Sequence, residues 1–281
     1  ESAPSGTFGN AGDESAPGGP FGNAGDERVG VEPTAAQRRV AALLESAGSA
    51  VVLTGAGISV PSGIPDFRTP VTGMWANVDP MQIAHIGVWR SDPERFWAFY
   101  AHRFHLLGPA QPNPAHLAVA ELQRRGLIGP LITQNIDRLH AKGGADDIVE
   151  MHGSISHGRC LACGARVEYD ELTARIDDAP DGVPRCVCGA PLKPGVVLFG
   201  EMLDADAVDR AVAACASADL IIAIGSSLEV HPVAALPSLV LERGGDLVLV
   251  TQGATPYDDV ASERLGGDVV DELTGVLAAL G

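Results

Sequence analysis

The sequence has no run of 18 apolar residues, although 46% of its 281 residues are hydrophobic. A membrane-spanning helix needs a run of about that length, so a transmembrane span is not expected. No charged, apolar and small-residue signal segment opens the sequence. We therefore expect a soluble protein of the cytoplasm, with no membrane partner.

Positive charge is also scarce, since 19 Lys and Arg residues face 36 Asp and Glu residues and give a formal net charge of -17. Only two of the basic residues are lysines, Lys142 and Lys193. This balance argues against direct nucleic-acid binding through a basic patch and favours cationic partners, such as lysine-rich protein segments. The sequence does not predict an oligomeric state.

Cysteine is rare, but four of the five cysteines form two close pairs. Cys160 and Cys163 lie in "CLAC", and Cys186 and Cys188 lie in "CVC" after an interval of 22 residues. Two thiolate pairs at this spacing are typical of a structural four-cysteine zinc ribbon, in which four thiolates fill the coordination sphere. A redox-active pair is the alternative, and Cys215 is expected to be a buried helix residue.

The first 26 residues form a tandem repeat, "ESAPSGTFGNAGD" followed by "ESAPGGPFGNAGD". Rich in Gly, Pro, Ala and Ser, the repeat cannot bury enough apolar surface to offset its ordering entropy. We expect residues 1–27 to be a disordered tail, with a linker or a docking segment as its role.

From residue 28 onward, short apolar runs alternate with helical patterns. The runs are "SAVVLTG", "GPLITQN", "DIVEMHG", "GVVLFGE", "ADLIIAIGSS" and "GDLVLVTQ". This alternation predicts an α/β fold with a doubly wound, Rossmann-like parallel sheet. A helical segment at about 69–112 and the cysteine segment at about 156–194 interrupt the pattern. We expect them to form a second, smaller lobe, part helical and part zinc ribbon.

Polar segments follow each apolar run, and in a parallel sheet these segments meet beyond the carboxyl ends of the strands, where ligands bind. In "TGAGIS", Gly55 and Gly57 let the backbone approach a pyrophosphate. The third glycine of the dehydrogenase spacing is missing, because Val60 stands there, and the expected acid would be Asp79, outside any strand pattern. The spacing indicates a dinucleotide site unlike that of a dehydrogenase, with a structural glycine turn as the alternative.

Three further segments carry candidate chemistry. In "SGIPDFR", an aromatic ring beside an arginine can shield a reactive sugar and hold phosphate, although a capped surface loop is the alternative. In "TQNIDRLH", Gln134, Asn135 and Asp137 can bind ribose hydroxyls, a carboxamide or water, with helix capping as the alternative. In "EMHGS", His152 follows a strand pattern and suits general-base work, whereas a structural histidine is the alternative.

Together these segments resemble the sirtuin family of NAD-dependent protein-lysine deacylases. The resemblance covers nearly all of residues 28–281 through "GAGISVPSGIPDFR", "TQNID" with "LH", "EMHG", the paired cysteines, "LKPGVVLFGE" and "GSSLEVHPVAALP". It implies a catalytic domain that consumes NAD as a cosubstrate and holds one structural Zn²⁺. In the family the acyl-lysine oxygen attacks the nicotinamide ribose, nicotinamide leaves, and the acyl group passes through an alkylamidate to ADP-ribose.

The resemblance also implies roles for single residues. His152 would deprotonate a ribose hydroxyl, Asn135 would orient ribose or water, and Asp137 would bind the carboxamide. The other implied dinucleotide contacts are Gly55, Ala56, Gly57, Asp66, Phe67, Arg68, Gln134, Gly225, Ser226, Ser227 and Thr251, of which Thr251 stands where the family often has Asn. The implied contacts to an acyl-lysine protein or peptide, which would bind as an added strand, are Val197, Phe199, Gly200, Glu201 and Val230.

In "FWAFYAHRFHLL", Tyr100 and Arg103 are three residues apart and therefore share one helix face. They resemble the Tyr-x-x-Arg pair of sirtuins that remove succinyl or malonyl groups, in which the pair holds the acyl carboxylate. The alternative is an arginine paired to a surface acid beside a core tyrosine. For the whole chain, the alternatives are a dehydrogenase, an idle NAD or ADP-ribose sensor and a mono-ADP-ribosyltransferase.

Overall fold

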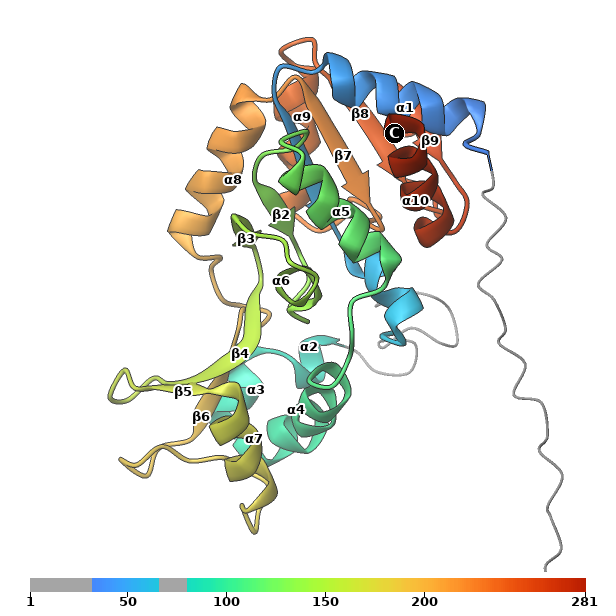
Figure 1. The fold of residues 1–281 in the computed structure, drawn as a ribbon. Coiled ribbons are helices and arrows are strands. Elements are labelled where there is room, and N and C mark those ends of the chain that lie inside the picture. Colours follow the sequence, from blue (N-terminus) through green and yellow to red (C-terminus); the bar gives the residue numbers. More distant parts are fainter. Residues whose placement is uncertain (1–31, 66–79) are drawn as a thin grey trace, which may run out of the picture. The chain divides into compact units, whose positions relative to one another are not determined.

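The computed structural model describes residues 32–65 and 80–281 (Figure 1). The repeat tail and residues 66–79 lie outside the described residues, and so do the predicted dinucleotide contacts Asp66, Phe67 and Arg68. No helix in the described part of the chain is long and apolar enough to span a membrane.

A six-stranded parallel sheet forms the centre of a large lobe, as the alternating pattern predicts. Its strand order is β3-β2-β1-β7-β8-β9, which reverses direction between β1 and β7. This is the doubly wound arrangement, and the reversal is the point at which such sheets bind ligands. The strands are β1 (Ala50–Thr54), β2 (Leu131–Thr133), β3 (Ile148–Glu150), β7 (Leu220–Ile224), β8 (Asp246–Val250) and β9 (Glu263–Leu265).

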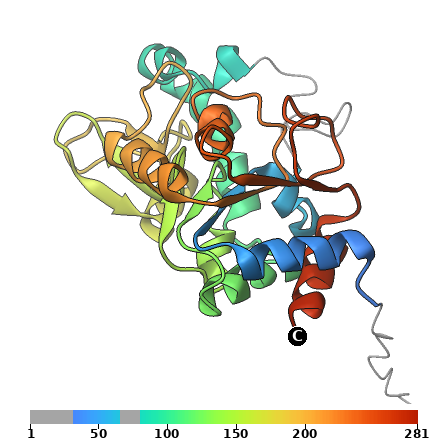
Figure 2. The same cartoon turned by 90° about the horizontal axis from the view of Figure 1, so that it is seen from above.

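Helices cover both faces of this sheet. One face packs on α1 (Ala35–Ser46), α5 (Pro114–Arg124) and α10 (Val269–Leu280), and the other on α8 (Ala205–Ser217) and α9 (Leu236–Leu241). Figure 2 shows the blue α1 and red α10 on one side of the strands and the orange helices on the other.

Because side chains alternate along a strand, each central strand contributes to both hydrophobic layers. On β1, Val52 belongs to the core under α1 and α5, whereas Val51 and Leu53 belong to the core under α8 and α9. All five residues of β1 are buried. This is why the strands read as continuous apolar runs in the sequence.

Local signals fix where the helices begin. Thr34 and Gln37 form a capping box at α1, in which the Thr34 Oγ1 accepts from the Gln37 amide at 3.2 Å. At α5 the Asn113 Oδ1 accepts from the Ala115 amide at 2.9 Å, and Pro114 occupies the first turn, where no amide donor is needed.

A small lobe combines the helical and cysteine-bearing segments (Figure 1). The helical segment forms α2 (Pro80–Ile83), α3 (Ile86–Ser91) and α4 (Pro93–Leu107). The cysteine segment forms an antiparallel sheet of order β5-β4-β6 with β4 (Gly153–Cys160), β5 (Arg166–Glu168) and β6 (Leu192–Val196), together with α7 (Tyr169–Asp177), which the sequence analysis did not anticipate. Trp89 and Trp97 join the two segments, because both indole N–H groups donate to the Leu192 carbonyl, at 3.1 and 3.0 Å.

One predicted strand was assigned to the wrong sheet. The run "GVVLFGE" does not belong to the parallel sheet, since Gly195 and Val196 end β6 of the small lobe and residues 198–201 form a turn. Val196 and Leu198 are buried in the core of the small lobe. An apolar run indicates burial, but it does not indicate which core buries it.

Candidate active site

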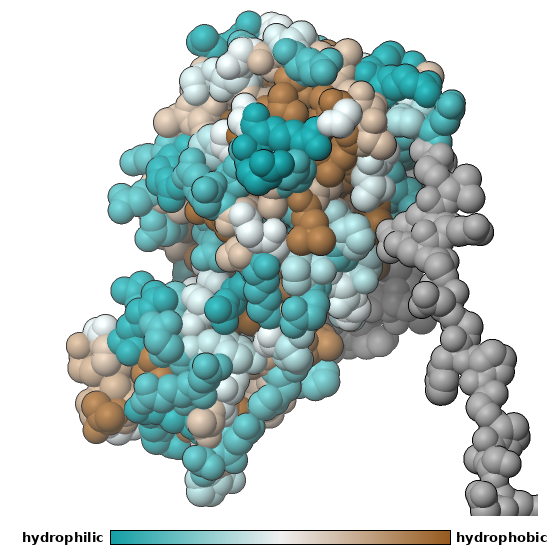
Figure 3. Space-filling model, in the orientation of Figure 1, coloured by the Kyte–Doolittle hydropathy of each residue, from teal (hydrophilic) through white to brown (hydrophobic). Residues whose placement is uncertain are grey.

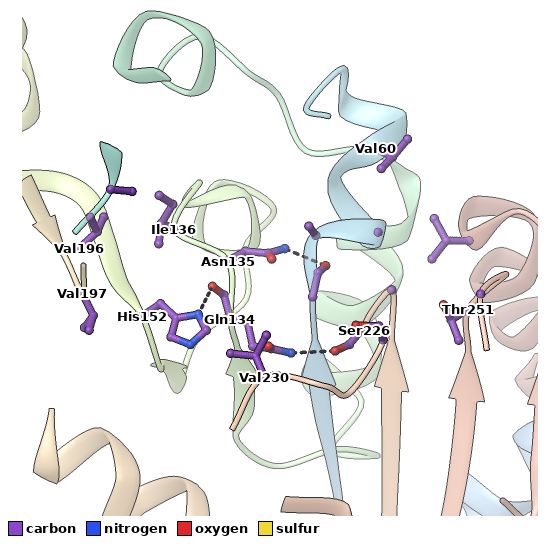
Figure 4. A pocket seen from close by; sticks show the side chains of 18 of the residues that line it. Val60, Gln134, Asn135, Ile136, His152, Val196, Val197, Ser226, Val230 and Thr251 are labelled. Atoms are coloured by element: carbon purple, nitrogen blue, oxygen red, sulfur yellow. Dashed lines mark hydrogen bonds between the residues drawn. The ribbon is translucent and has the colours of Figure 1, made fainter. Parts of the chain in front are cut away.

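A cavity of about 950 Å³ opens beyond the carboxyl ends of the parallel strands, between the two lobes. Its size is at the upper end of the range of small-molecule sites. Segments that follow β2, β1, β7 and β8 line it in the order of the sheet, namely Gln134 and Asn135, then Gly55, Ala56 and Gly57, then Gly225, Ser226 and Ser227, then Thr251. The remaining predicted residues in its wall are Tyr100, Arg103, His152, Val197, Phe199, Gly200, Glu201 and Val230. Figure 4 shows Thr251 at one end, Ser226 in the middle and His152 toward the small lobe.

Two glycine turns meet at the strand-order reversal. The Gly57 amide donates to the Gly225 carbonyl at 2.8 Å, and the Gly55 amide donates to the Ile224 carbonyl at 2.9 Å. A Cβ on Gly57 would lie 2.7 Å from the Gly225 Cα. These glycines therefore line the cavity and also allow β1 and β7 to approach closely, so the structural role left open by the sequence holds as well.

His152 lies directly after β3, in the wall of the cavity, and its orientation is fixed by its backbone-facing nitrogen. Nδ1 lies 2.9 Å from the Gln134 carbonyl, which can only accept, so Nδ1 carries the proton (Figure 4). Nε2 then holds the free lone pair. Burial lowers the pKa of His152, and the hydrogen bond to Gln134 only partly opposes this. The ring is therefore neutral near pH 7 and can act as a base.

Asn135 carries a buried acceptor that its protein surroundings do not use. Its Nδ2 donates to the Gly55 carbonyl at 3.0 Å and contacts the Ser59 Oγ at 3.3 Å. Its Oδ1 is buried and has no hydrogen-bond partner among the described residues. An unpaired buried carbonyl is costly, so this oxygen favours a ligand that brings a donor, such as a ribose hydroxyl or an ordered water.

Asp137 lies beside the large cavity and not in its wall. It lines a narrow pocket with Ala56, Ile64 and Asn135. Its Oδ2 accepts from the Ser59 hydroxyl at 2.7 Å, and its Oδ1 accepts from the Leu139 amide at 2.9 Å, at the start of α6 (Leu139–Lys142). Asp137 thus accepts from the first amide of α6, although the N-cap residue of this short helix is Arg138. Burial raises the pKa of Asp137, against these hydrogen bonds.

Tyr100 and Arg103 both line the cavity from α4, where they are 4% exposed each. The guanidinium carbon of Arg103 lies 5.3 Å from the centre of the Tyr100 ring. Burial lowers the pKa of Arg103 and raises the pKa of Tyr100. Two largely buried polar groups of this kind in the wall of a cavity are suited to a carboxylate ligand.

Two buried histidines near the cavity were given no role from the sequence, although His140 lies in the quoted "LH". His116 on α5 and His140 on α6 have ring centres 4.9 Å apart. His116 Nε2 lies 3.4 Å from the Ser59 Oγ, and His140 Nε2 lies 2.9 Å from the Thr54 Oγ1. Burial lowers their pKa values to about 4 and about 3, so both are neutral. His116 lies in a helical pattern that looks like an ordinary core face, and His140 lies in a helix of only four residues, so periodicity did not reveal them.

The four predicted metal ligands come together in the small lobe. The sulfurs of Cys160, Cys163, Cys186 and Cys188 all lie within 4.8 Å of one another. The Cys160–Cys188 and Cys163–Cys186 sulfur pairs are 3.5 and 3.6 Å apart. Tetrahedral zinc with Zn–S bonds of about 2.3 Å places its sulfurs about 3.8 Å apart, a separation within the range that this cluster spans. Cys215, outside the cluster, is fully buried in α8, as expected.

Comparison with known proteins agrees with this geometry. The chain is 42% identical over 251 residues to the NAD-dependent protein deacetylase of Caldivirga maquilingensis, across 86% of this chain and 95% of that protein. It is 42% identical over 229 residues to NAD-dependent protein deacylase 1 of Archaeoglobus fulgidus, across 79% of this chain and 90% of that protein. A solved structure of a Sir2 variant with a deacetylated p53 peptide and 3'-O-acetyl ADP-ribose matches with a TM-score of 0.82 at 37% identity, covering 86% of this chain and 97% of that one. A family model described as the Sir2 family matches residues 55–232, and the chain therefore belongs to the Sir2 family.

Proposed function

We propose that this chain is an NAD-dependent protein-lysine deacylase, which transfers the acyl group of acyl-lysine to ADP-ribose and releases nicotinamide. Its relatives are named for this activity, and the Sir2 variant structure holds a peptide with an acetylated ADP-ribose. One observation carries the proposal. A single cavity joins the glycine turns of the sheet reversal, the unused Asn135 oxygen and the neutral His152.

NAD fits the cavity by size and by chemistry. The glycine turns allow close backbone approach, and the buried Asn135 Oδ1 needs a donor, which a ribose hydroxyl supplies. When bound, NAD supplies an anomeric carbon with nicotinamide as its leaving group. The residues proposed to hold it are Gly55, Ala56, Gly57, Gln134, Asn135, Asp137, Gly225, Ser226, Ser227 and Thr251, and Asp66, Phe67 and Arg68 stay predicted contacts outside the described residues.

His152 is proposed as the general base. With Nδ1–H fixed on the Gln134 carbonyl, Nε2 is the nitrogen that takes a proton from a ribose hydroxyl. The same carbonyl stabilises the imidazolium that forms. Asn135 is proposed to orient the ribose or a water molecule, because its Nδ2 is already held by the Gly55 carbonyl and its Oδ1 remains available.

The acyl-lysine peptide is proposed to bind as an added strand between the 198–201 turn and Val230. The Val197, Leu198, Phe199 and Glu201 amides of this region all donate within the protein. The Gly200 amide has no acceptor among the described residues. Gly200 also lines the cavity, so this amide is the natural donor to a peptide carbonyl.

The four cysteines are proposed to hold one structural zinc ion. Since four thiolates complete a tetrahedral site, the metal has no open position for substrate and supports the fold of the small lobe. A cytoplasmic location is also proposed, because clustered cysteines that bind a metal are typical of a reducing compartment, whereas disulfides are typical of an oxidising one.

The activity is tested by measuring nicotinamide release from NAD with an acetyl-lysine peptide. We expect release that requires the peptide and yields free lysine, and we expect His152→Ala to lower the rate by about a hundredfold or more, the usual worth of a general base. His105→Ala is the matched control, because His105 is half exposed on α4 and pairs with Asp177 away from the cavity. Appearance of NADH, or transfer of labelled ADP-ribose to protein, would replace the deacylase proposal with a dehydrogenase or an ADP-ribosyltransferase.

For the acyl group, we propose that succinyl- and malonyl-lysine are substrates besides acetyl-lysine. Tyr100 and Arg103 lie together in the cavity wall, where they can hold the acyl carboxylate by a hydrogen bond and a charged contact.

Arg103→Met is expected to lower kcat/KM for a succinyl-lysine peptide by at least about tenfold, since a buried carboxylate loses its only charged partner in this pair. The same peptide with acetyl-lysine serves as the control and should change less. Equal losses with both peptides would show that Arg103 supports the fold and does not select the acyl group.

A further inference from the structure

Lys193 is a buried lysine of the small lobe. It lies on β6 and is 6% exposed. A buried ammonium is costly unless it is paired and hydrogen-bonded. The Lys193 Nζ lies 2.8 Å from the Glu201 Oε2 and donates to the Val196 carbonyl at 2.6 Å and the Pro194 carbonyl at 3.2 Å. Its three hydrogens therefore have three acceptors.

Glu201 connects this ammonium to the wall of the cavity. Its Oε2, besides contacting Lys193, accepts from the Leu198 amide at 2.9 Å. The Glu201 amide in turn donates to the Leu198 carbonyl at 3.0 Å, which closes the 198–201 turn. Glu201 is also a predicted peptide contact. One of its carboxylate oxygens therefore already stabilises the 198–201 turn through the Leu198 amide and Lys193.

The 198–201 turn contains a glycine whose backbone conformation bears on why the turn needs stabilising contacts. Gly200, its third residue, has a φ of +82°. Glycine adopts a positive φ freely, whereas residues with a side chain rarely do. Such flexibility also lets the turn open, unless other contacts hold it closed.

The turn is anchored to the catalytic side of the cavity at its base. The Val197 amide donates to the His152 carbonyl at 2.8 Å. On the other side, the Phe199 amide donates to the Ala84 carbonyl at 3.1 Å, and the Phe199 carbonyl accepts from the Ile86 amide at 2.9 Å. Figure 4 shows Val196 and Val197 on the same side of the cavity as His152. A shift of the turn therefore changes the distance between a bound peptide and His152.

We propose that Lys193 is a positioning residue for the acyl-lysine peptide, an inference that rests on the proposed deacylase function. Its ammonium holds the Glu201 carboxylate against the Leu198 amide, and this contact keeps Phe199 and Gly200 where a peptide strand can pair with them. Lys193 itself is not in the cavity wall and touches no reacting group. The glycine turns that line the dinucleotide end belong to the large lobe and do not depend on it.

The test compares steady-state kinetics of the full chain carrying Lys193→Met and Lys193→Arg with wild type, varying peptide and NAD in turn. For Lys193→Met we expect KM for the peptide to rise by about tenfold, because the methionine keeps the aliphatic stem and removes the charge that holds Glu201. KM for NAD and kcat should stay within about twofold. Lys193→Arg keeps a charged donor and should restore most of the peptide affinity.

Arg166→Met is the matched control, because Arg166 lies in the same lobe and pairs with Glu168 at 2.7 Å on an exposed surface. It should leave both KM values unchanged. An unchanged peptide KM in Lys193→Met would overturn the proposal, and so would a parallel loss of peptide affinity, NAD affinity and kcat.

If Lys193→Met does not fold, Glu201→Gln provides the test, since it keeps the shape of the acid and weakens its ion pair with Lys193. An unchanged peptide KM in folded Glu201→Gln would equally overturn it.

Failure of the proposed deacylase function would give a different result from failure of the positioning role. Wild type would then release no nicotinamide with any acyl-peptide. In that case binding of a fluorescent acyl-lysine peptide, read by anisotropy, replaces the kinetics. Weaker binding by Lys193→Met than by wild type supports the positioning role, and equal binding refutes it.

Discussion

At the scale of single residues, the site depends on which polar atoms the protein leaves available. His152 uses Nδ1 on the Gln134 carbonyl, and Asn135 uses Nδ2 on the Gly55 carbonyl. The lone pair on His152 Nε2 and the Asn135 Oδ1 remain for a ligand. Each side chain is thus fixed by one polar atom and presents the other, which lowers the entropic cost of ordering it when substrate binds.

The protonation of His152 predicts the acid limb of the pH profile. Burial lowers the pKa of His152 below its ordinary value near 6.5, and only the neutral ring can accept a proton. Activity should therefore be fully present above that value and fall only as the pH drops through the lowered pKa. The measurement is kcat/KM for an acetyl-lysine peptide between pH 5 and 8, which reports the free enzyme. An acid limb centred above pH 6.5 would contradict the assignment.

At the scale of elements, the site depends on the contact between the turns after β1 and β7. Gly225 has a φ of +61°, and a Cβ there would lie 2.4 Å from the Ile58 amide nitrogen, near the start of the 3-10 helix η1 (Ala56–Ser62). The loop after β7 continues through a second 3-10 helix, η2 (Val233–Ala235), into α9. The two turns come from distant parts of the sequence, and their close packing forms one wall of the cavity.

Gly225→Ala is expected to push these turns apart. The clash is with backbone, which cannot move aside easily, and the positive φ adds strain, so we expect a loss of about 2 kcal/mol or more in the free energy of unfolding. NAD binding should weaken as well. Gly266→Ala is the control, since a Cβ there meets nothing within 4 Å. Urea denaturation of the two variants makes the comparison, and equal stabilities would show that the turns yield easily.

The sequence predicted most of the large lobe because its strands are buried on both faces and its helices carry local caps. It did not reveal β9, in which Glu263 and Arg264 precede the single buried residue Leu265. It also placed "GVVLFGE" in the wrong sheet, because the choice between two cores is settled by long-range packing. The ion pair between Lys193 and Glu201 and the position of Asp137 beside the cavity likewise depend on tertiary packing. No periodic pattern in the sequence indicates either of them.

At the scale of the whole molecule, negative charge dominates. The formal net charge is -17, and Figure 3 shows hydrophilic side chains over much of one face, with hydrophobic groups in smaller patches. The summed field of such a surface attracts cationic segments and repels anionic ones before any contact forms. Substrate choice should therefore depend on the residues around the acyl-lysine as well as on the acyl group.

This field predicts a salt dependence that differs between peptides. An acetyl-lysine peptide flanked by arginines should react with a higher kcat/KM at low salt than one flanked by serines, because steering raises the encounter rate. Raising NaCl from about 50 to 300 mM shortens the screening length to below about 10 Å and should remove most of that advantage. The Lys193→Met variant offers an internal control, since it weakens peptide binding by loosening the turn and should keep the same relative salt dependence. If both peptides lost activity in parallel with salt, the effect would lie in the enzyme's own stability, and charge would not select the substrate.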